Sequence, residues 1–539
     1  MKYLFKHFLY IVFLSAILFG CGATSVVLST PIENIDTSPI KEVELSESQK
    51  NTWSHLDLIQ DTIPGMSVDK AYSDIIKNRK GKTVIVAVID SGTDIDHEDL
   101  NDVLWTNKKE VPNNGKDDDN NGYIDDIHGW NFLGDGYDEQ LEYVRLLAAG
   151  DKSAPRYAEA EALYNTEYQK YLGYKTNYEQ TLQLITVADD VLTKHFRKTN
   201  YTKKEIIAIK TEDEKLGQAV QVAQFVYAND LESIASAKKE FEEGLESIND
   251  RLNANLNKNL KGRTTGDNPN DLNDKVGYGN NNPRPIKDSE NHGTHVTGII
   301  AAERNNNTGM NGVANNVQIM AIRAVPNGDE YDKDIALAIR YAADNGAKVI
   351  NGSFGKSFSP NSQWVRDAIK YAAEKDVLFV HAAGNDSEDI DVAPNFPNDA
   401  VGVGPEVSDN VITVGSLTNK YGSTLVSDFS NFGKVNVDVF APGSDIYSTM
   451  PGNKYKMNSG TSMASPNVAG VAALVRSQYP SLTASQVKKV LMDSGLPIKT
   501  KVTIGKDKQL KTLNEISTSG RIVNAYNALI LASQMANFK

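Results

Sequence analysis

The chain has a single cysteine among its 539 residues, and this scarcity limits how the fold can be stabilised. One cysteine cannot form a disulfide within the chain, so stability outside the cell must come from packing or from a bound metal. Basic residues are also in deficit, since 56 Lys and Arg stand against 70 Asp and Glu, a net charge of −14. Because this charge repels phosphates, the composition argues against nucleic acid as a partner.

Long apolar runs are rare as well, and the one that exists is N-terminal. It extends from Phe8 to Gly20 behind Lys2 and Lys6, and no second stretch approaches the length of a membrane-spanning helix. The run ends at Cys21 and resembles a bacterial lipoprotein signal; the alternative is an ordinary secretory signal with an incidental cysteine. We therefore predict lipidation at Cys21 and a protein of the cell envelope, anchored by acyl chains to a bacterial membrane and facing outside the cytoplasm.

The rest of the sequence alternates two apolar patterns. Short, β-branched apolar runs predict buried strands at residues 83–89, 317–321, 348–350, 377–380 and 411–414. Helical patterns lie between them, for example at 334–344 and 362–374. This alternation predicts an α/β fold with a mostly parallel sheet covered by helices on both faces. Catalytic groups are expected at the carboxyl ends of such strands.

A serine near the C-terminus opens one of the predicted helices. Ser462 follows Thr461 and the turn glycine Gly460, and an apolar run occupies residues 468–475. Its Oγ would be exposed at the positive end of the helix dipole. Since a serine hydroxyl alone is a weak nucleophile, this position needs a base and a group that orients the base.

Other segments offer both groups. Asp90 ends the strand 83–89, and His292 stands in Asn-His-Gly-Thr-His-Val-Thr-Gly at the start of a predicted helix. Together with Ser462, in the order Asp, His, Ser, these segments resemble the subtilisin-like (subtilase) serine peptidases. Asn385, in Ala-Ala-Gly-Asn, resembles the oxyanion-hole asparagine of that family. The resemblance covers residues from about Ile63 to the C-terminus and is interrupted by one long insertion.

The resemblance implies a role for each catalytic residue. His292 would accept the proton of Ser462 and return it to the leaving amine, and Asp90 would hold the correct tautomer of the histidine. Asn385 would donate to the developing oxyanion together with the backbone N–H of Ser462. A capping histidine and a turn asparagine are the simpler interpretations of His292 and Asn385.

The resemblance also implies where a substrate binds. An extended peptide would add as a strand along one segment and meet the wall of the first specificity pocket on the other. We infer that small wall residues leave a roomy, apolar slot that tolerates large apolar side chains. The substrate-binding residues implied are Ser353, Phe354 and Gly355 on the first segment and Ala382, Ala383 and Gly384 on the second.

An acidic segment, 114–126, carries a second chemical signal. Oxygen ligands alternate along it, a glycine at position 122 permits a sharp turn, and the pattern matches the opening of an EF-hand calcium loop. The twelfth position is His128, where a bidentate Glu is expected, so Asp126 or a residue from elsewhere must close the shell. The alternative is a solvated acidic loop without a cation. The predicted structural calcium ligands are Asp117, Asp119, Asn121, Tyr123 through its carbonyl, and Asp125.

The separation of 202 residues between positions 90 and 292 predicts an inserted, all-helical hairpin or bundle at 136–262. Tyr164, Tyr171, Tyr178, Ile185 and Leu192 recur every seven residues as an apolar seam, which is either the core of that bundle or a binding face. The predicted domains are a signal peptide at 1–20, a lipid-anchored tether at 21–62, the first part of the catalytic domain with its calcium loop at 63–135, the insertion, and the second catalytic part at 263–539.

These features together predict a membrane-anchored serine endopeptidase that acts on proteins or peptides through an acyl-enzyme. One alternative is a catalytically silent, calcium-stabilised binding module on the envelope, with the helical insertion as the site of a protein partner. Another is a processing enzyme dedicated to one partner that the insertion selects. Subtilases usually carry a folded prodomain, and the stretch after residue 21 is short for one. Either the protein folds without a prodomain or another segment replaces it.

Overall fold

The computed structural model describes residues 27, 29–33, 43–229, 231–274 and 277–537. The predicted signal peptide and the predicted lipidation site, Cys21, lie outside these residues. Two compact units make up the chain. Unit 1 consists of Met1–Asp135, Thr265–Val325 and Tyr331–Lys539, and unit 2 consists of Gly136–Thr264 and Pro326–Glu330.

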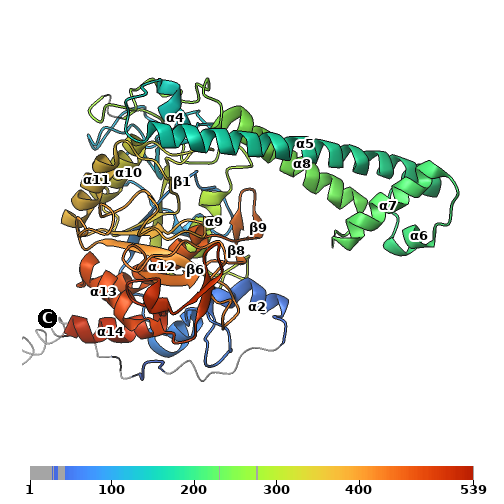
Figure 1. Cartoon of the computed structure of the whole chain (residues 1–539). Coiled ribbons are helices and arrows are strands. Elements are labelled where there is room, and N and C mark those ends of the chain that lie inside the picture. Colours follow the sequence, from blue (N-terminus) through green and yellow to red (C-terminus); the bar gives the residue numbers. More distant parts are fainter. Residues whose placement is uncertain (1–26, 28, 34–42, 230, 275–276, 538–539) are drawn as a thin grey trace, which may run out of the picture. The chain divides into compact units, whose positions relative to one another are not determined.

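A nine-stranded sheet runs through unit 1 (Figure 1). Its strand order is β10-β13-β7-β6-β5-β4-β1-β3-β2, and every neighbouring pair is parallel except β10–β13. The strands are β1 Val84–Asp90, β2 Gly129–Asn131, β3 Val317–Arg323, β4 Val349–Gly352, β5 Leu378–Ala382, β6 Val411–Leu417, β7 Val439–Pro442, β10 Leu496–Pro497 and β13 Arg521–Ile522. Two small hairpins complete the strands: β8 Ile446–Met450 with β9 Lys454–Asn458, and β11 Val502–Ile504 with β12 Gln509–Lys511.

Helices cover both faces of this sheet. One apolar core joins one face to α9, α12, α13 and α14, and a second core joins the other face to α10 and α11. Alternate residues of β1 divide between the two cores, as Val86 and Val88 enter the first and Ala87 and Ile89 the second. The predicted α/β fold is therefore confirmed. The helices of unit 1 are α2 Glu47–Thr52, η2 Trp53–His55, α3 Val68–Lys70, η3 Ala71–Ile76, η4 Asn101–Val103, α9 His292–Ala301, α10 Asp332–Asp344, α11 Ser362–Glu374, α12 Thr461–Gln478, α13 Ala484–Ser494, η6 Leu513–Glu515 and α14 Ala525–Asn537.

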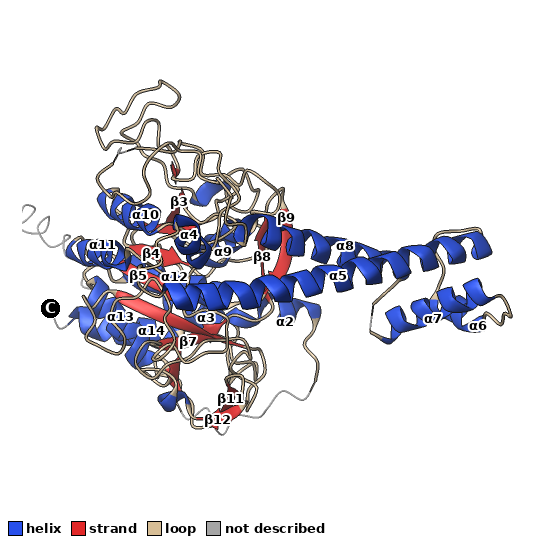
Figure 2. Cartoon of the chain, turned by 45° about the horizontal axis from the view of Figure 1, so that its top comes forward, coloured by secondary structure: helices blue, strands red, loops and turns tan. Residues whose placement is uncertain are grey.

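Unit 2 is helical in the described residues. Its long helix α5 runs side by side with α8 in both views (Figures 1 and 2). A separate apolar core forms where α5, α6, α7 and α8 meet, and it includes Ile185 and Leu192 of the predicted seam. The tyrosines of the seam, such as Tyr164 and Tyr171, remain half-exposed. The helices of unit 2 are α4 Glu142–Ala149, α5 Tyr157–Phe196, α6 Lys203–Ala208, α7 Glu214–Ala228, α8 Ile234–Asp250 and η5 Arg251–Asn255.

The segment before the catalytic strands packs on unit 1 and is not a free tether along its length. Trp53 is 1% exposed, and its indole N–H donates to the carbonyls of Ser444 and Asp445, both at 3.1 Å. Farther upstream, the backbone of Ile32 exchanges two hydrogen bonds with the side chain of Asn527 on α14. The predicted tether boundary, 21–62, is therefore wrong for its described residues, because a buried tryptophan ties them to the core. Among the described residues, no helix combines the length and apolar character needed to cross a bilayer.

Candidate active site

Two of the predicted catalytic residues, Asp90 and His292, meet at the carboxyl end of β1 and form a dyad. Asp90 is the last residue of that strand, and its side chain is 1% exposed. Oδ1 accepts hydrogen bonds from the N–H of Ser91 at 2.7 Å and from Nδ1 of His292 at 2.8 Å. Because a carboxylate only accepts, Nδ1 of His292 carries the proton and Nε2 is left as the basic nitrogen.

His292 is the first residue of α9, and the chain approaches β1 closely there. A Cβ on Gly293 would lie 2.2 Å from the carbonyl oxygen of Gly92, so only glycine fits behind the histidine. Burial disfavours the imidazolium, but the charge of Asp90 and its hydrogen bond outweigh burial and raise the pKa of His292. A histidine that binds a proton more tightly is a better general base once it is neutral.

Ser462 occupies the first turn of α12, as the sequence predicts. In the described structure its hydroxyl donates to the carbonyl of Ser353 at 3.2 Å. General-base catalysis therefore requires this hydroxyl to leave the carbonyl of Ser353 and donate to Nε2 of His292. Hydrogen bonds between catalytic groups commonly form only when substrate binds.

Asn385, in the loop after β5, is hydrogen-bonded to Thr461, the first residue of α12. Oδ1 of Asn385 accepts from the backbone N–H of Thr461 at 2.8 Å and from its hydroxyl at 3.0 Å. The carbonyl end of the carboxamide is thereby occupied, and the NH2 end is left to donate. Thr461 is thus a positioning residue for Asn385. The sequence motif around Ser462 includes Thr461 but does not show this role, because a hydrogen bond between residues 76 positions apart leaves no local pattern.

The predicted substrate segments lie where two paired strands separate. Pairing of β4 with β5 ends at Gly352 and His381, so the segments 353–355 and 382–384 continue as the two sides of a gap. Ser353 also contacts the nucleophile's backbone, since its hydroxyl donates to the carbonyl of Ser462 at 2.9 Å. From the other predicted segment, the N–H of Gly384 donates to the hydroxyl of Thr461 at 3.0 Å. The role of both segments in substrate binding stays a prediction.

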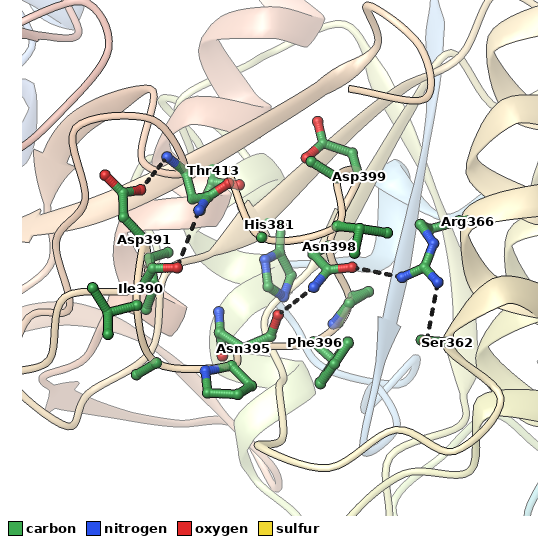
Figure 3. A pocket seen from close by; sticks show the side chains of 18 residues that line it. Ser362, Arg366, His381, Ile390, Asp391, Asn395, Phe396, Asn398, Asp399 and Thr413 are labelled. Atoms are coloured by element: carbon green, nitrogen blue, oxygen red, sulfur yellow. Dashed lines mark hydrogen bonds between the residues drawn. The ribbon is translucent and has the colours of Figure 1, made fainter. Parts of the chain in front are cut away.

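His381 belongs to β5 and is paired with Gly352 where the two strands separate. The sequence pattern gave no sign of its contact with a substrate segment, because it predicts only one more residue of a buried strand. The Nε2–H of His381 donates to the carbonyl of Phe354 at 2.9 Å, and burial lowers the pKa of the imidazole to about 4. It lines a pocket of about 280 Å³, and Figure 3 shows it near Asn395 and Asn398. Asn395 also lines this pocket, and its amide donates to the carbonyl of Ala383, one of the predicted wall residues, at 3.2 Å.

Three carboxylates gather at the acidic loop. Ligand oxygens of Glu110, Asp117 and Asp119 all lie within 4.8 Å of one another, and this cluster could hold a metal ion. Glu110 is 6% exposed and accepts the backbone N–H groups of Asp118 and Asp119 at 2.9 and 3.1 Å. It precedes the predicted loop, and its carboxylate is a member of the cluster that the spacing pattern did not include.

Asp125, another predicted ligand, is not part of this cluster of carboxylates. The carboxylate of Asp125 accepts the N–H groups of Asn114 and Gly115 at 3.1 and 2.9 Å and so closes the loop on itself. The side-chain oxygen of Asn121 accepts the N–H of Tyr123 at 2.8 Å. The carboxylate at position 126 points elsewhere, toward the hydroxyl of Tyr341 at 2.5 Å, and burial raises its pKa to about 6.

The sequence of the chain is similar to those of known serine proteinases. The model of the Subtilase family, Peptidase_S8, matches residues 81–516. The chain is 47% identical over 192 residues to the thermophilic serine proteinase of Bacillus sp. (strain AK1), which covers 35% of this chain and 44% of that protein. It is 42% identical over 201 residues to thermitase of Thermoactinomyces vulgaris, covering 37% and 65% of the two chains. Against subtilisin DY of Bacillus licheniformis the identity is 39% over 205 residues, covering 38% and 70%.

A solved structure of proteases from Pseudoalteromonas arctica matches with 29% identity and a TM-score of 0.38, over 48% of this chain and 80% of that one. The matches span less than two thirds of the length of the first two relatives. The family model extends over most of the chain, including both sides of the helical insertion.

Proposed function

The chain belongs to the subtilase family of serine peptidases, and we propose that it is an endopeptidase that hydrolyses peptide bonds in proteins or peptides. The observation that carries this proposal is the 2.8 Å contact between Nδ1 of His292 and Asp90, next to a helix that presents Ser462. A catalytically silent binding module would have no need for this dyad, and the complete set of catalytic side chains argues against that alternative.

The side chains support an acyl-enzyme route. Nε2 of His292 takes the proton of Ser462 as its Oγ attacks the substrate carbonyl, and Asp90 stabilises the imidazolium that forms. The NH2 group of Asn385 and the backbone N–H of Ser462 donate to the oxyanion. His292 then protonates the leaving amine, and a water activated by the same histidine releases the acyl group.

Labelling with a fluorophosphonate probe tests the proposal directly, because only an activated serine reacts rapidly. The wild-type chain is expected to be labelled and to cleave denatured casein. The variant Ser462→Ala should lose both reactions while its circular dichroism spectrum stays unchanged. Undiminished hydrolysis in a folded Ser462→Ala chain would exclude Ser462 as the nucleophile.

A structural calcium ion fits the acidic loop. Three carboxylates whose oxygens lie within 4.8 Å repel one another unless a cation offsets their charge, and hard oxygen ligands are the donor set of calcium. Glu110, Asp117 and Asp119 would hold the ion. It would supply no chemistry to peptide hydrolysis and would fix the loop that leads into β2.

Attachment to the envelope follows from the sequence alone. Cys21 is the one cysteine of the chain and directly follows the apolar signal, which supports acylation at this residue and a location on a bacterial membrane outside the cytoplasm. Fractionation of cells tests it. The variant Cys21→Ser should move from the membrane fraction to the soluble fraction, and a variant that stays with the membrane would exclude acylation as the anchor.

A further inference from the structure

A buried ion pair lies directly beside the catalytic dyad. Nη2 and Nε of Arg323 donate to Oε1 of Glu290 at 2.5 and 3.1 Å, and the two side chains are 0% and 3% exposed. Neither residue faces a substrate. Replacing a buried ion pair by apolar residues is often neutral or even stabilising, so stability alone does not explain why this one is present.

The pair connects three segments of the chain through hydrogen bonds. The second oxygen of Glu290, Oε2, accepts the N–H of Ile286 at 2.6 Å and so closes the turn that leads into α9. From the other side, Nη1 of Arg323 donates to Oδ1 of Asn131 and to the carbonyl of Gly134, both at 3.1 Å. The end of β2, the end of β3 and the approach to α9 are therefore held at one point.

Both members of the pair are adjacent to the dyad in the fold. Arg323 is the register partner of Asp90, so their side chains leave neighbouring parallel strands on the same face of the sheet. Glu290 precedes His292 by two residues. On its other flank, His292 is followed by Gly293, which packs against Gly92, so the start of α9 is fixed from both sides.

We propose that Glu290 and Arg323 are positioning residues that set the place of His292 relative to Asp90. The inference rests on the proposed peptidase function and deepens it. The ion pair holds the chain immediately before the histidine, and the charge of Glu290 neutralises the guanidinium next to the dyad. Loss of the carboxylate would move the histidine and also remove the negative charge that offsets the buried guanidinium close to it.

The sign of the electrostatic effect follows from the charges around His292. Asp90 on β1 is the negative charge that contacts the imidazole. His295 on the same helix is the other titratable group that interacts with it, and its ring bonds to the backbone carbonyl of Lys456 on β9. A guanidinium without its partner disfavours the imidazolium. The acid limb of the rate profile, which reports protonation of His292, should then move to lower pH.

The variant Glu290→Gln tests this prediction, since it keeps the shape of the side chain and removes its charge. We expect kcat on a short peptide to fall about 10- to 100-fold with little change in KM, and the acid limb to shift down. The double variant Glu290→Gln with Arg323→Met has no unpaired charge. Its acid limb should return to the wild-type position while kcat stays low.

Two controls separate positioning from general stability. Asp267→Asn breaks a second fully buried ion pair, with Lys333 at 2.7 Å, and should lower the unfolding temperature without moving the acid limb. Glu290→Asp keeps the charge and should restore the acid limb even if Glu290→Gln folds poorly. A folded Glu290→Gln chain with the wild-type kcat and pH profile would overturn the proposal. The same holds if Glu290→Gln changes kcat and the acid limb only as much as Asp267→Asn does.

A readout without turnover distinguishes this inference from the proposed function. The Nδ1 proton of His292, hydrogen-bonded to Asp90, gives a low-field proton resonance that can be followed in the inactive Ser462→Ala background. Glu290→Gln should shift or broaden this resonance and lower its titration midpoint. If the wild-type chain fails to hydrolyse peptides, the function is wrong but this measurement still decides the role of the pair, and an unchanged resonance and midpoint would refute it.

Discussion

Nδ1 of His292 lies 2.8 Å from Oδ1 of Asp90, although 202 residues separate them in the chain. The contact spans Gly136–Thr264, the longer segment of unit 2, in sequence, yet both residues belong to unit 1. The dyad is therefore a property of the sheet and its helices. Its carboxylate is buried, whereas the histidine side chain is 38% exposed, so the imidazole can reach a bound substrate.

The first prediction concerns the pH dependence of hydrolysis. The charge of Asp90 and its hydrogen bond raise the pKa of His292 against the opposing effect of burial, so the acid limb of kcat/KM should lie above the ordinary pKa of histidine. Asp90→Asn should move this limb to lower pH and reduce kcat by roughly 10⁴-fold, because the tautomer is no longer held. Rates on a peptide substrate between pH 5 and 9 measure both effects. Asp96→Asn, at a carboxylate paired with Arg284, is the control, and an acid limb that is the same in Asp90→Asn as in the wild type would contradict the assignment.

The second prediction concerns the oxyanion donor. Asn385→Ala should lower kcat by about 10²- to 10³-fold with KM nearly unchanged, since the lost hydrogen bond forms mainly in the transition state. Thr461→Val removes the hydroxyl that accompanies the backbone N–H on Oδ1 of Asn385, so it should give a smaller loss of the same kind. Steady-state kinetics on one peptide substrate decide this. A rise in KM with constant kcat would assign Asn385 to substrate binding instead.

The third prediction separates the clustered carboxylates, Glu110, Asp117 and Asp119, from Asp125, a ligand expected from spacing alone. If calcium binds at Glu110, Asp117 and Asp119, ion at 100 times its dissociation constant adds about 2.7 kcal/mol, and chelation lowers the unfolding temperature by roughly 3 °C. Glu110→Gln should abolish this response. Asp125→Asn should keep it, because that carboxylate binds backbone N–H groups of the loop. An unfolding temperature that ignores both chelator and calcium would refute a structural site.

The sequence predicted the fold class and the elements that carry the catalytic residues, because both depend on local patterns. A β-branched run followed by Asp90 predicts the end of a buried strand, and Gly460 before Ser462 predicts the turn into a helix. Glu110 could not be found in this way, since its link to Asp117 and Asp119 depends on how the loop folds back. Likewise, Thr461 and Arg323 act through partners that are distant in the chain, and no spacing rule identifies them.

The N-terminal segment shows a different limit of sequence patterns. Polar residues around Trp53 suggested a solvated tether, yet this one side chain buries itself against the loop at Ser444 and fixes the segment to the core. The average composition of a segment does not show whether a single large apolar residue within it is buried. Burial of one tryptophan removes enough apolar surface from water to outweigh the polar character of its neighbours.

The fourth prediction uses the carboxyl group of Asp399, which interacts with Glu406 and Lys488. Burial, strengthened by the charge of Glu406, raises the pKa of Asp399 to about 7, and Lys488 only partly offsets this. Between its ordinary pKa and pH 7 the folded chain therefore binds more protons than the unfolded chain, so stability falls as pH rises through this window. Asp399→Asn should reduce the drop in unfolding temperature between pH 5 and pH 8. Asp507→Asn, at an exposed site, serves as the control, and an equal drop in all three proteins would contradict the shift.

The fifth prediction concerns the helical insertion. All four catalytic side chains belong to unit 1, whereas unit 2 has an apolar core of its own that includes Ala188 and Val226. We therefore expect that replacing residues 136–262 by a short Gly-Ser linker preserves reaction with a fluorophosphonate and cleavage of denatured casein. Cleavage of folded proteins should change, because a unit inserted between Asp90 and His292 can select or exclude a folded partner.

A smaller deletion controls for damage at the junction. Arg145 of α4 donates to the backbone carbonyls of Asp329 and Glu330, which belong to unit 2 as well, so the linker variant leaves those carbonyls without this partner. A second variant that shortens only α5 to α8 and keeps Arg145 should behave like the first toward casein and the probe. If both variants fold but no longer react with the fluorophosphonate, the insertion builds part of the active site, and its role as a selector of folded substrates is excluded.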